Sequence, residues 1–457
     1  MPRHLTAAPR HHIAPRHHIA PRHHIAPRHH IAPRHHRVHT TSERDMYRKT
    51  VLGSGLRIVS ETIPWVRSLA IGAWIDAGSR DEQSAQNGIA HFIEHAVFKG
   101  TTTRKTHQIA QYLEAVGGYV NAFTGKDSTC YYARVLDRHV GRAVTILADL
   151  VGKPAYPERE IEREKQVIID EMRSVEDDPE DVINDYFEQL LFGSHALSMP
   201  VIGTEHSVRA LAREDLLAFT RTRYTAANTV IAASGNVDHD ELVALCAEAF
   251  DLPGGKPVAR TKPRAVRARA LELHKSVQQA HIVMGRVVPG LRAPSTHTLA
   301  LLNAALGEGM SSRLFQRVRE KAGYSYNIYS FTNLFEDVGV FAVYAGGETR
   351  NIERMRRIIE RELEDLVEHP LSARELNRAR EQVAGSLLLG LESMSTRMHR
   401  LGRDELVFGY DTPIDSILDE LYAVTAADVQ ALAANACDHS AYSSVVILPD
   451  GRDNADD

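Results

Sequence analysis

The sequence predicts an α+β protein in which two related halves follow a low-complexity N-terminal tail. Three observations lead to this fold class. Strand-like apolar runs alternate with long amphipathic helical patterns, the pattern of one half recurs weakly in the other, and a six-residue repeat fills the start of the chain. A chain of 457 residues is long enough for two large domains or three ordinary ones, each with its own core.

The tail comprises residues 1–45, in which Ala-Pro-Arg-His-His-Ile recurs with a period of six from Ala8 and which hold 12 of the 25 histidines. A proline in every repeat interrupts any helix, and one isoleucine per repeat forms no core, so we expect a disordered His/Arg/Pro segment. It lacks the apolar stretch of a secretory signal. Three interpretations stay open: a metal-binding tract, an appendage without function, or an untranslated leader before a true start at Met46. Composition favours the last two.

The body of the chain, residues 46–457, differs from the tail in charge. The tail carries +6 and the whole chain −5, so the body carries −11, which argues against nucleic acid as the main partner. The body contains no apolar run of about 18 residues, so we expect no membrane insertion. The three cysteines are few, distant and odd in number, which fits a reducing compartment, and we expect a cytoplasmic location.

Strand-like and helical segments alternate along the body. Long amphipathic patterns predict helices at residues 161–173 and 351–368. Apolar runs of strand length predict strands at residues 68–77, 229–233, 279–288, 338–345 and 443–448.

The two halves resemble each other when the chain is shifted by 216 residues. Leu150-Val151 then falls on Leu366-Val367 and Pro154 on Pro370, each where one helix ends and another begins. We therefore predict a first half at residues 46–257 and a second half at residues 275–457. Residues 258–274 are basic and follow a Pro-Gly-Gly stretch, so they are predicted to form the linker.

The sharpest local motif is His91-Phe92-Ile93-Glu94-His95. On a helix His91 and His95 share a face, and two imidazoles so placed can hold one zinc ion. Glu94 flanks that face and can take a proton from a water molecule that the metal activates. The order is the His-Glu-x-x-His zinc-protease motif in reverse. The alternative, a helix with two chance histidines, leaves this carboxylate unexplained.

A catalytic zinc site needs a third protein ligand and an open position. Glu164 and Glu171 lie seven residues apart, two turns along one face of a predicted helix. One of them can reach the metal while the other supports a ligand. A charged, solvated helix face explains the same pattern, and spacing alone does not decide between these readings.

With these residues the body resembles the pitrilysin–insulinase–mitochondrial processing peptidase family of inverted zinc proteases. The resemblance covers nearly all of residues 46–457 and is greatest to the short-chain branch with bacterial homologues of the processing peptidase β subunit. It implies one Zn²⁺ per chain held by His91, His95 and Glu171, with Glu94 as general base and Glu164 supporting a ligand. It also implies that each half is a mostly antiparallel β-sheet packed with α-helices.

The resemblance extends to residues that would bind substrate. Gly117–Thr124 resembles the family's edge strand, along which a peptide lies as an added strand, and places Asn121 and Ala122 beside the scissile bond. The plain alternative is a hairpin strand. An Arg and a Tyr seven residues apart hold the substrate backbone in the family. Both Arg319/Tyr326 and Arg317/Tyr324 have this spacing, and we favour Arg319/Tyr326 because its context resembles the short-chain branch.

The resemblance implies a zinc-dependent endopeptidase that hydrolyses unfolded or extended peptides in an enclosed chamber. The second half lacks the metal-binding residues and would complete that chamber. Family chambers enclose substrate between two pairs of halves, so this chain would pair with itself or with a related chain. The alternative is a non-catalytic structural or partner subunit. Acidic residues 176–181 hint at basic substrates, but a solvated acidic loop is the favoured explanation.

Overall fold

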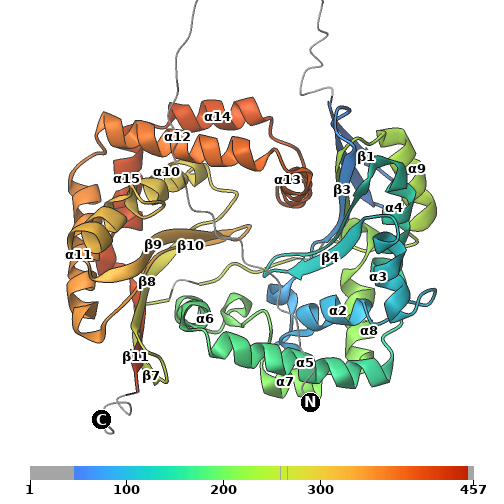
Figure 1. The fold of residues 1–457 in the computed structure, drawn as a ribbon, viewed down its shortest axis with the longest axis horizontal. Helices are drawn as coiled ribbons and strands as arrows, with labels where there is room; N and C mark the ends of the chain where they lie inside the picture. The colour runs from blue at the N-terminus through green and yellow to red at the C-terminus, as the bar shows by residue number, and fades with distance from the viewer. Residues whose placement is uncertain (1–45, 258, 265, 451–457) are drawn as a thin grey trace, which may run out of the picture. The chain divides into compact units, whose positions relative to one another are not determined.

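The computed structural model describes residues 46–257, 259–264 and 266–450. The predictions made for the tail therefore lie outside the described residues. Within the described part, two β-sheets are each packed with helices (Figure 1), which confirms the predicted α+β class. No helix in this part of the chain is both long enough and apolar enough to cross a membrane.

The first sheet has six strands in the order β1-β2-β6-β3-β5-β4. Neighbouring strands are antiparallel except β2 and β6, which are parallel. The strands predicted at 68–77 and 229–233 are β3 and β6, and both are almost wholly buried because they lie inside the sheet. The bounds are β1 Tyr47–Val51, β2 Arg57–Thr62, β3 Ser68–Ile75, β4 Tyr119–Thr124, β5 Thr129–Leu136 and β6 Thr229–Gly235.

The second sheet has five strands in the order β7-β11-β8-β10-β9, and again one neighbouring pair, β7 and β11, is parallel. This order matches that of the first sheet without β1, strand for strand, which confirms two related halves. The predicted strands at 279–288, 338–345 and 443–448 are β8, β10 and β11. The bounds are β7 Ala270–Lys275, β8 Ala280–Pro289, β9 Ser325–Leu334, β10 Val338–Gly347 and β11 Ser443–Pro449.

The C-terminal end of the predicted linker was wrong. Its last residues, from Ala270 on, belong to β7 and pair with β11 from Ser444 on. This edge strand alternates exposed and half-buried residues and carries charges, so it lacks the apolar run by which the other strands were found.

The helices also repeat between the halves. The predicted helices at 161–173 and 351–368 are α5 and α11. Helix α4 ends at Gly152 and α11 at Glu368, 216 residues apart, and each is followed by two more helices, α5 and α6 or α12 and α13. The bounds are α2 Ile89–Val97, α3 Thr106–Glu114, α4 Val140–Gly152, α5 Glu158–Glu176, α6 Pro179–Phe192, α7 Glu205–Ala210, α8 Arg213–Arg223, α9 His239–Ala249, α10 Thr296–Leu306, α11 Ile352–Glu368, α12 Ala373–Gly390, α13 Met394–Val407, α14 Ile414–Ala423 and α15 Ala426–Ala436, with a π-helical segment η6 at Phe315–Lys321.

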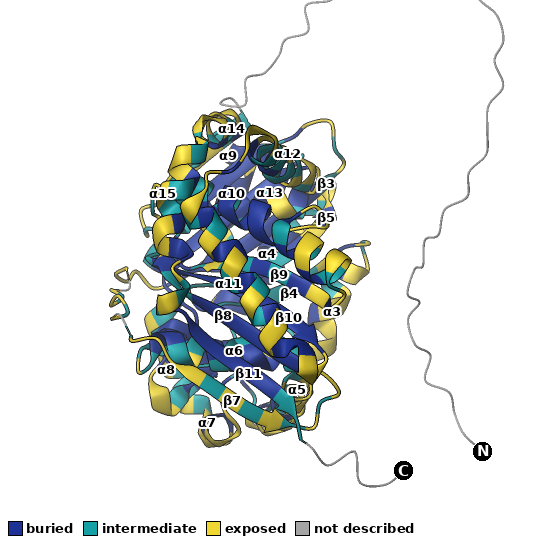
Figure 2. Cartoon of the chain, turned by 90° about the vertical axis from the view of Figure 1, so that its left-hand side faces the viewer, coloured by how far each residue is buried: buried dark blue, intermediate teal, exposed yellow. Residues whose placement is uncertain are grey.

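Two equivalent helices cross between the halves. Helix α13 of the second half packs on β2, β3 and β6 of the first sheet (Figure 1). Met398 of this helix is fully buried there against Trp74. Helix α6 of the first half packs on β8 and β11 of the second sheet through Ile183 and Phe187. Each sheet therefore has one face covered by helices of its own half and the other face covered by a helix of the other half of the chain. Strands β8 and β10 are accordingly buried, whereas exposed residues lie along the outer helices (Figure 2).

Because α13 packs closely on the first sheet, we expect a substitution of Gly402 to lower the stability of the fold. A Cβ added there would overlap the indole ring of Trp74, so Gly402→Ala should lower the free energy of unfolding by about 1–3 kcal/mol. Gly385→Ala is the matched control, because a Cβ at this position in α12 meets nothing within 4 Å. The control should leave stability unchanged or raise it by up to about 1 kcal/mol. Equal unfolding midpoints in urea would contradict the packing described.

Candidate metal centre

Helix α2 carries the His91, Glu94 and His95 side chains and contacts α5 on one side and the edge strand β4 on the other. Its apolar face, which includes Phe92 and Ile93, is fully buried in the core of the first half. The polar residues fall on the remaining face because they lie three and four positions apart. Sequence periodicity thus fixes which way the motif points.

The N-terminus of α2 is held by Glu82, a buried residue that the sequence analysis missed. Its carboxylate accepts hydrogen bonds from the backbone N–H of Gly88 at 2.7 Å and of Ala90 at 2.9 Å, and from the Asn87 amide at 2.9 Å. Burial raises the pKa of Glu82 to about 7 against the lowering effect of these donors. Gly88 begins the helix with a φ of +91°, which favours glycine. No spacing rule links Glu82 to the motif.

His91, His95 and Glu171 come together at one point. The Nε2 atoms of His91 and His95 lie 3.9 and 3.7 Å from Glu171 Oε2, and one ligand atom from each residue lies within 4.8 Å of the others. A tetrahedral zinc ion with bonds of about 2.1 Å holds its ligand atoms about 3.4 Å apart. Two imidazoles and a carboxylate are also a donor set of catalytic zinc sites. The residues fit a zinc ion after small movements.

Glu164 lies on the other nitrogen of His95. Its Oε1 accepts a hydrogen bond from His95 Nδ1 at 2.9 Å, while Lys99 Nζ lies 2.8 Å from Oε2. Burial alone would raise the pKa of Glu164, but the bonds to His95 and Lys99 outweigh it and lower that pKa. A charged Glu164 keeps the proton of His95 on Nδ1 and leaves Nε2 free for a metal. Lys99 was also missed, although it lies one helical turn beyond His95.

The same environment sets the protonation of the other groups. Burial, with a smaller contribution from His95, lowers the pKa of His91 to about 4, so this imidazole is neutral and able to bind a metal near pH 7. Burial raises the pKa of Glu94. Glu94 Oε2 is buried without a hydrogen-bond partner among the described residues, which leaves it available to a water molecule or a substrate.

Removing the charge of Glu164 tests its support of His95. Glu164→Gln should weaken zinc binding by about 10–100-fold, because the amide holds the His95 tautomer less firmly. Competition with a chelator of known affinity measures the change. Glu162→Gln makes the same substitution on an exposed side chain of α5 and should leave the affinity unchanged. Equal affinities in both variants would contradict the role of Glu164.

Asn121 and Ala122 lie on β4, the end strand of the first sheet, and among the described residues β4 pairs with β5 alone. Along β4 exposed and half-buried residues alternate, with Asn121 exposed. The outward-pointing N–H of Ala122 donates to the Asn121 side-chain oxygen at 2.9 Å, so an added strand would displace this local bond. The structure therefore places both residues on an open edge beside the helix that carries Glu94.

Arg319 and Tyr326 lie together on the second half. The Arg319 guanidinium lies 4.5 Å from the centre of the Tyr326 ring, which is 78% exposed. In the alternative pair, Arg317 bonds to Glu362 at 3.2 Å and Tyr324 lies under Arg354. No hydrogen bond or ion pair of the described residues joins Arg319 or Tyr326 to the histidine cluster.

Comparison with known proteins adds to this geometry. Residues 57–205 match the family described as insulinase (peptidase family M16), and residues 210–383 match the one described as peptidase M16 inactive domain. Among similar proteins, an uncharacterised zinc protease of Streptomyces coelicolor is 42% identical over 397 residues, covering 84% of this chain and 86% of that protein. One from Mycobacterium tuberculosis is 40% identical, covering 88% and 93%.

Solved structures share the fold. A protease from Helicobacter pylori superposes with a TM-score of 0.83 at 23% identity and covers 88% of this chain and 99% of its own. A Pseudomonas fluorescens structure described as a peptidase M16 inactive domain gives a TM-score of 0.82 at 21% identity, with coverage of 88% and 98%. At these identities the likeness concerns the arrangement of helices and strands alone.

Proposed function

The chain belongs to the M16 insulinase family, and from this membership together with the geometry of α2 and α5 we propose that it is a zinc-dependent endopeptidase acting on unfolded or extended peptides. One observation carries the proposal. His91, His95 and Glu171 present three ligand atoms within 4.8 Å of one another, next to a buried Glu94 oxygen that has no partner in the described chain. A purely structural role in the fold does not explain why three ligand atoms converge beside an unpartnered carboxylate oxygen.

Zinc held by these three residues would polarise a scissile carbonyl and lower the pKa of a bound water molecule towards about 7. Glu94 would take the proton of the attacking water and pass it to the leaving amine. Burial raises the pKa of Glu94, which brings it closer to the working pH and so suits a group that both accepts and returns a proton. Glu164 would keep His95 oriented throughout.

The peptide would lie along β4 as an added strand, held by main-chain hydrogen bonds on the side where Asn121 and Ala122 lie. This mode requires an extended backbone, so folded proteins would be poor substrates. Arg319 and Tyr326 would hold the substrate backbone or stabilise the developing oxyanion. Arg319 lies on η6 and Tyr326 on β9 of the second half. A second chain would have to bring this pair to the metal centre.

We further propose that two chains associate and that Arg319 and Tyr326 of one chain serve the metal centre of the other. Mixing two inactive variants tests this. A Glu94→Gln chain supplies an intact Arg319, and an Arg319→Ala chain supplies an intact Glu94, so a mixed dimer would regain one working site. Restored hydrolysis is the expected result. No recovery, or an active monomer in sedimentation, would contradict the proposal.

Hydrolysis of an internally quenched peptide tests the proposed function. Activity should disappear with a zinc chelator and return with added zinc. A non-catalytic partner subunit of the family is the alternative, and the presence of Glu94, Glu164 and the three metal-binding residues in one chain argues against it. If the zinc-loaded protein hydrolyses no peptide, the alternative is correct.

A further inference from the structure

Helix α2 is short and carries a metal-binding histidine in its first turn. It spans the nine residues Ile89–Val97, and His91 is the third of them. The first N–H groups of a helix have no partner within the helix, and the end frays unless another group caps it. The N-cap residue is Gly88, which has no side chain for this purpose. The position of His91 therefore depends on a capping group from elsewhere in the chain.

Glu82, which lies outside the helix, supplies this cap. Its carboxylate accepts hydrogen bonds from the N–H of Gly88 at 2.7 Å and from the N–H of Ala90 at 2.9 Å. It also accepts one from the amide of Asn87 at 2.9 Å, and the same amide donates to the Pro200 carbonyl. The last backbone group held in this way belongs to the residue immediately before the first metal-binding histidine.

The backbone at the start of α2 is also packed against a second segment. A Cβ added to Gly203 would lie 2.5 Å from the carbonyl oxygen of Asn87, so no larger residue fits there. The Ser207 hydroxyl donates to the same oxygen at 2.7 Å. The start of α2 is thus fixed from two sides, by this segment and by the Glu82 carboxylate.

The Glu82 carboxylate has its hydrogen-bond partners in one place. Glu82 is only 8% exposed, and burial raises the pKa of its carboxyl group to about 7. Lys126, which lowers this pKa, pairs with Glu188 at 3.0 Å and not with Glu82. A buried carboxylate is costly unless hydrogen bonds compensate. Among the described residues the compensating bonds all come from the start of α2, so the effect of Glu82 is concentrated there.

Helix α10 is the counterpart of α2 in the second half, because it follows β8 as α2 follows β3. At its start, the N–H of Thr296 donates to the Ala293 carbonyl and the N–H of Leu299 to that of Ser295. No carboxylate of the described chain caps its first turn. The fold therefore forms this helix without a buried carboxylate in the half that lacks the metal-binding residues.

We propose that Glu82 is a positioning residue for the metal centre, which by capping α2 fixes the place of His91 and so sets the zinc affinity and the rate of hydrolysis. The effect on the rate rests on the proposed endopeptidase function, whereas the effect on zinc affinity is tested independently of it. Glu82 acts through the helix, because in the described chain its side chain bonds to neither histidine of the motif.

Glu82→Gln tests the proposal. Glutamine has the same size, but one of its two oxygens becomes an NH₂ group, which accepts no hydrogen bond from a backbone N–H. Competition with a chelator should show a loss of zinc affinity of about tenfold or more. With zinc in excess, kcat for a quenched peptide should fall by about tenfold while KM stays unchanged, because β4 and not α2 would hold the peptide.

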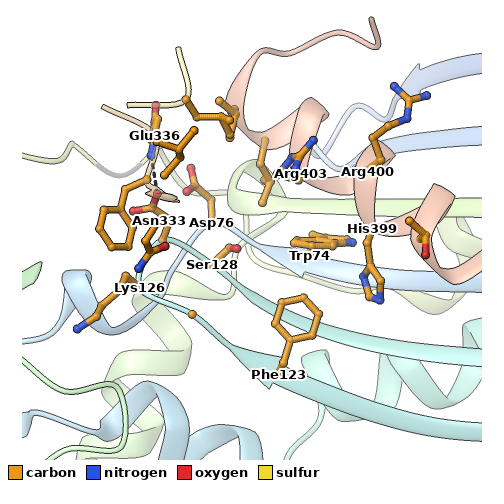
Figure 3. Close-up of a pocket in the computed structure, with 18 of the residues that line it drawn as sticks. Trp74, Asp76, Phe123, Lys126, Ser128, Asn333, Glu336, His399, Arg400 and Arg403 are labelled. Atoms are coloured by element: carbon orange, nitrogen blue, oxygen red, sulfur yellow. Dashed lines mark hydrogen bonds between the residues drawn. The ribbon is translucent and has the colours of Figure 1, made fainter. Parts of the chain in front are cut away.

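Glu61→Gln is the matched control, because Glu61 is 7% exposed and as buried as Glu82. Its carboxylate bonds to Arg397 of α13, on the sheet face where Trp74 lies beside His399 (Figure 3). Helix α2 belongs to the core on the other face of that sheet. The control should lower the stability of the fold but leave zinc affinity and kcat unchanged.

Unchanged zinc affinity in Glu82→Gln overturns the proposal. An equal loss in Glu61→Gln also overturns it, because general destabilisation then explains the effect, and so does a change confined to KM. If Glu82→Gln does not fold, Glu82→Asp replaces it. Its carboxylate is one methylene short of the three donors, so it should also weaken zinc binding, and wild-type affinity would contradict the proposal. A wild type that binds zinc but hydrolyses no peptide overturns the proposed function alone, since the zinc comparison still decides the role of Glu82.

Discussion

Glu94→Gln should lower the rate of peptide hydrolysis by about 10²–10⁴-fold, because glutamine has the same shape but takes no proton from water. Zinc should remain bound at the wild-type level, since Glu94 is not among the three residues whose ligand atoms converge. The rate is measured with a quenched peptide and the zinc by metal analysis of the same sample.

Glu162→Gln is the matched control for this prediction. The Glu162 side chain is 70% exposed on α5 and is not among the converging metal-binding residues. It should leave both rate and zinc unchanged. A Glu94→Gln enzyme with normal turnover would show that another group acts as the base. Loss of zinc in that variant would show instead that Glu94 supports the metal.

His95→Ala should remove zinc and abolish hydrolysis together. The substitution takes away one of the three converging ligand atoms and also leaves Glu164 without its histidine partner, although Lys99 still pairs with Glu164. The fold should persist, because the His95 side chain is 22% exposed and lies at the surface of the first core. Metal analysis and circular dichroism of one sample separate metal loss from unfolding.

His107→Ala serves as the control for removal of a histidine, because His107 is exposed on α3. It should retain zinc and activity. Full zinc in His95→Ala would contradict the metal centre, whereas a loss of helical signal would indicate unfolding and not loss of a ligand. In that case His95→Gln, closer in size, repeats the measurement.

The fold was predictable where its signals are local. Buried strands such as β3 and β10 stand out as apolar runs, and α5 and α11 stand out by their periodicity. The crossing of α6 and α13 was not predictable. Met394, Met398 and Leu401 mark an apolar helix face, but a face does not record which of two similar sheets it will cover. That choice depends on contacts distant in sequence.

In the metal centre too, some features follow from local sequence spacing and others do not. His91, Glu94 and His95 lie on one short helix, so spacing alone brings them together. Spacing does not distinguish Glu164 from Glu171, because both lie on one face of α5. The structure separates them by environment: the Glu164 side chain is 5% exposed and bonded to His95, whereas the Glu171 side chain is 44% exposed beside both Nε2 atoms. Glu82 bonds to groups only five to eight residues further on, but no regular spacing marks these contacts in the sequence.

The most direct test of the account is a zinc count on a chain that begins at Met46. This chain lacks the histidine-rich repeat but keeps His91, His95 and Glu171. Metal analysis after dialysis should find one zinc ion per chain. A truncated chain that retains no zinc under conditions in which the full chain binds it would place the metal on the tail and contradict the metal centre.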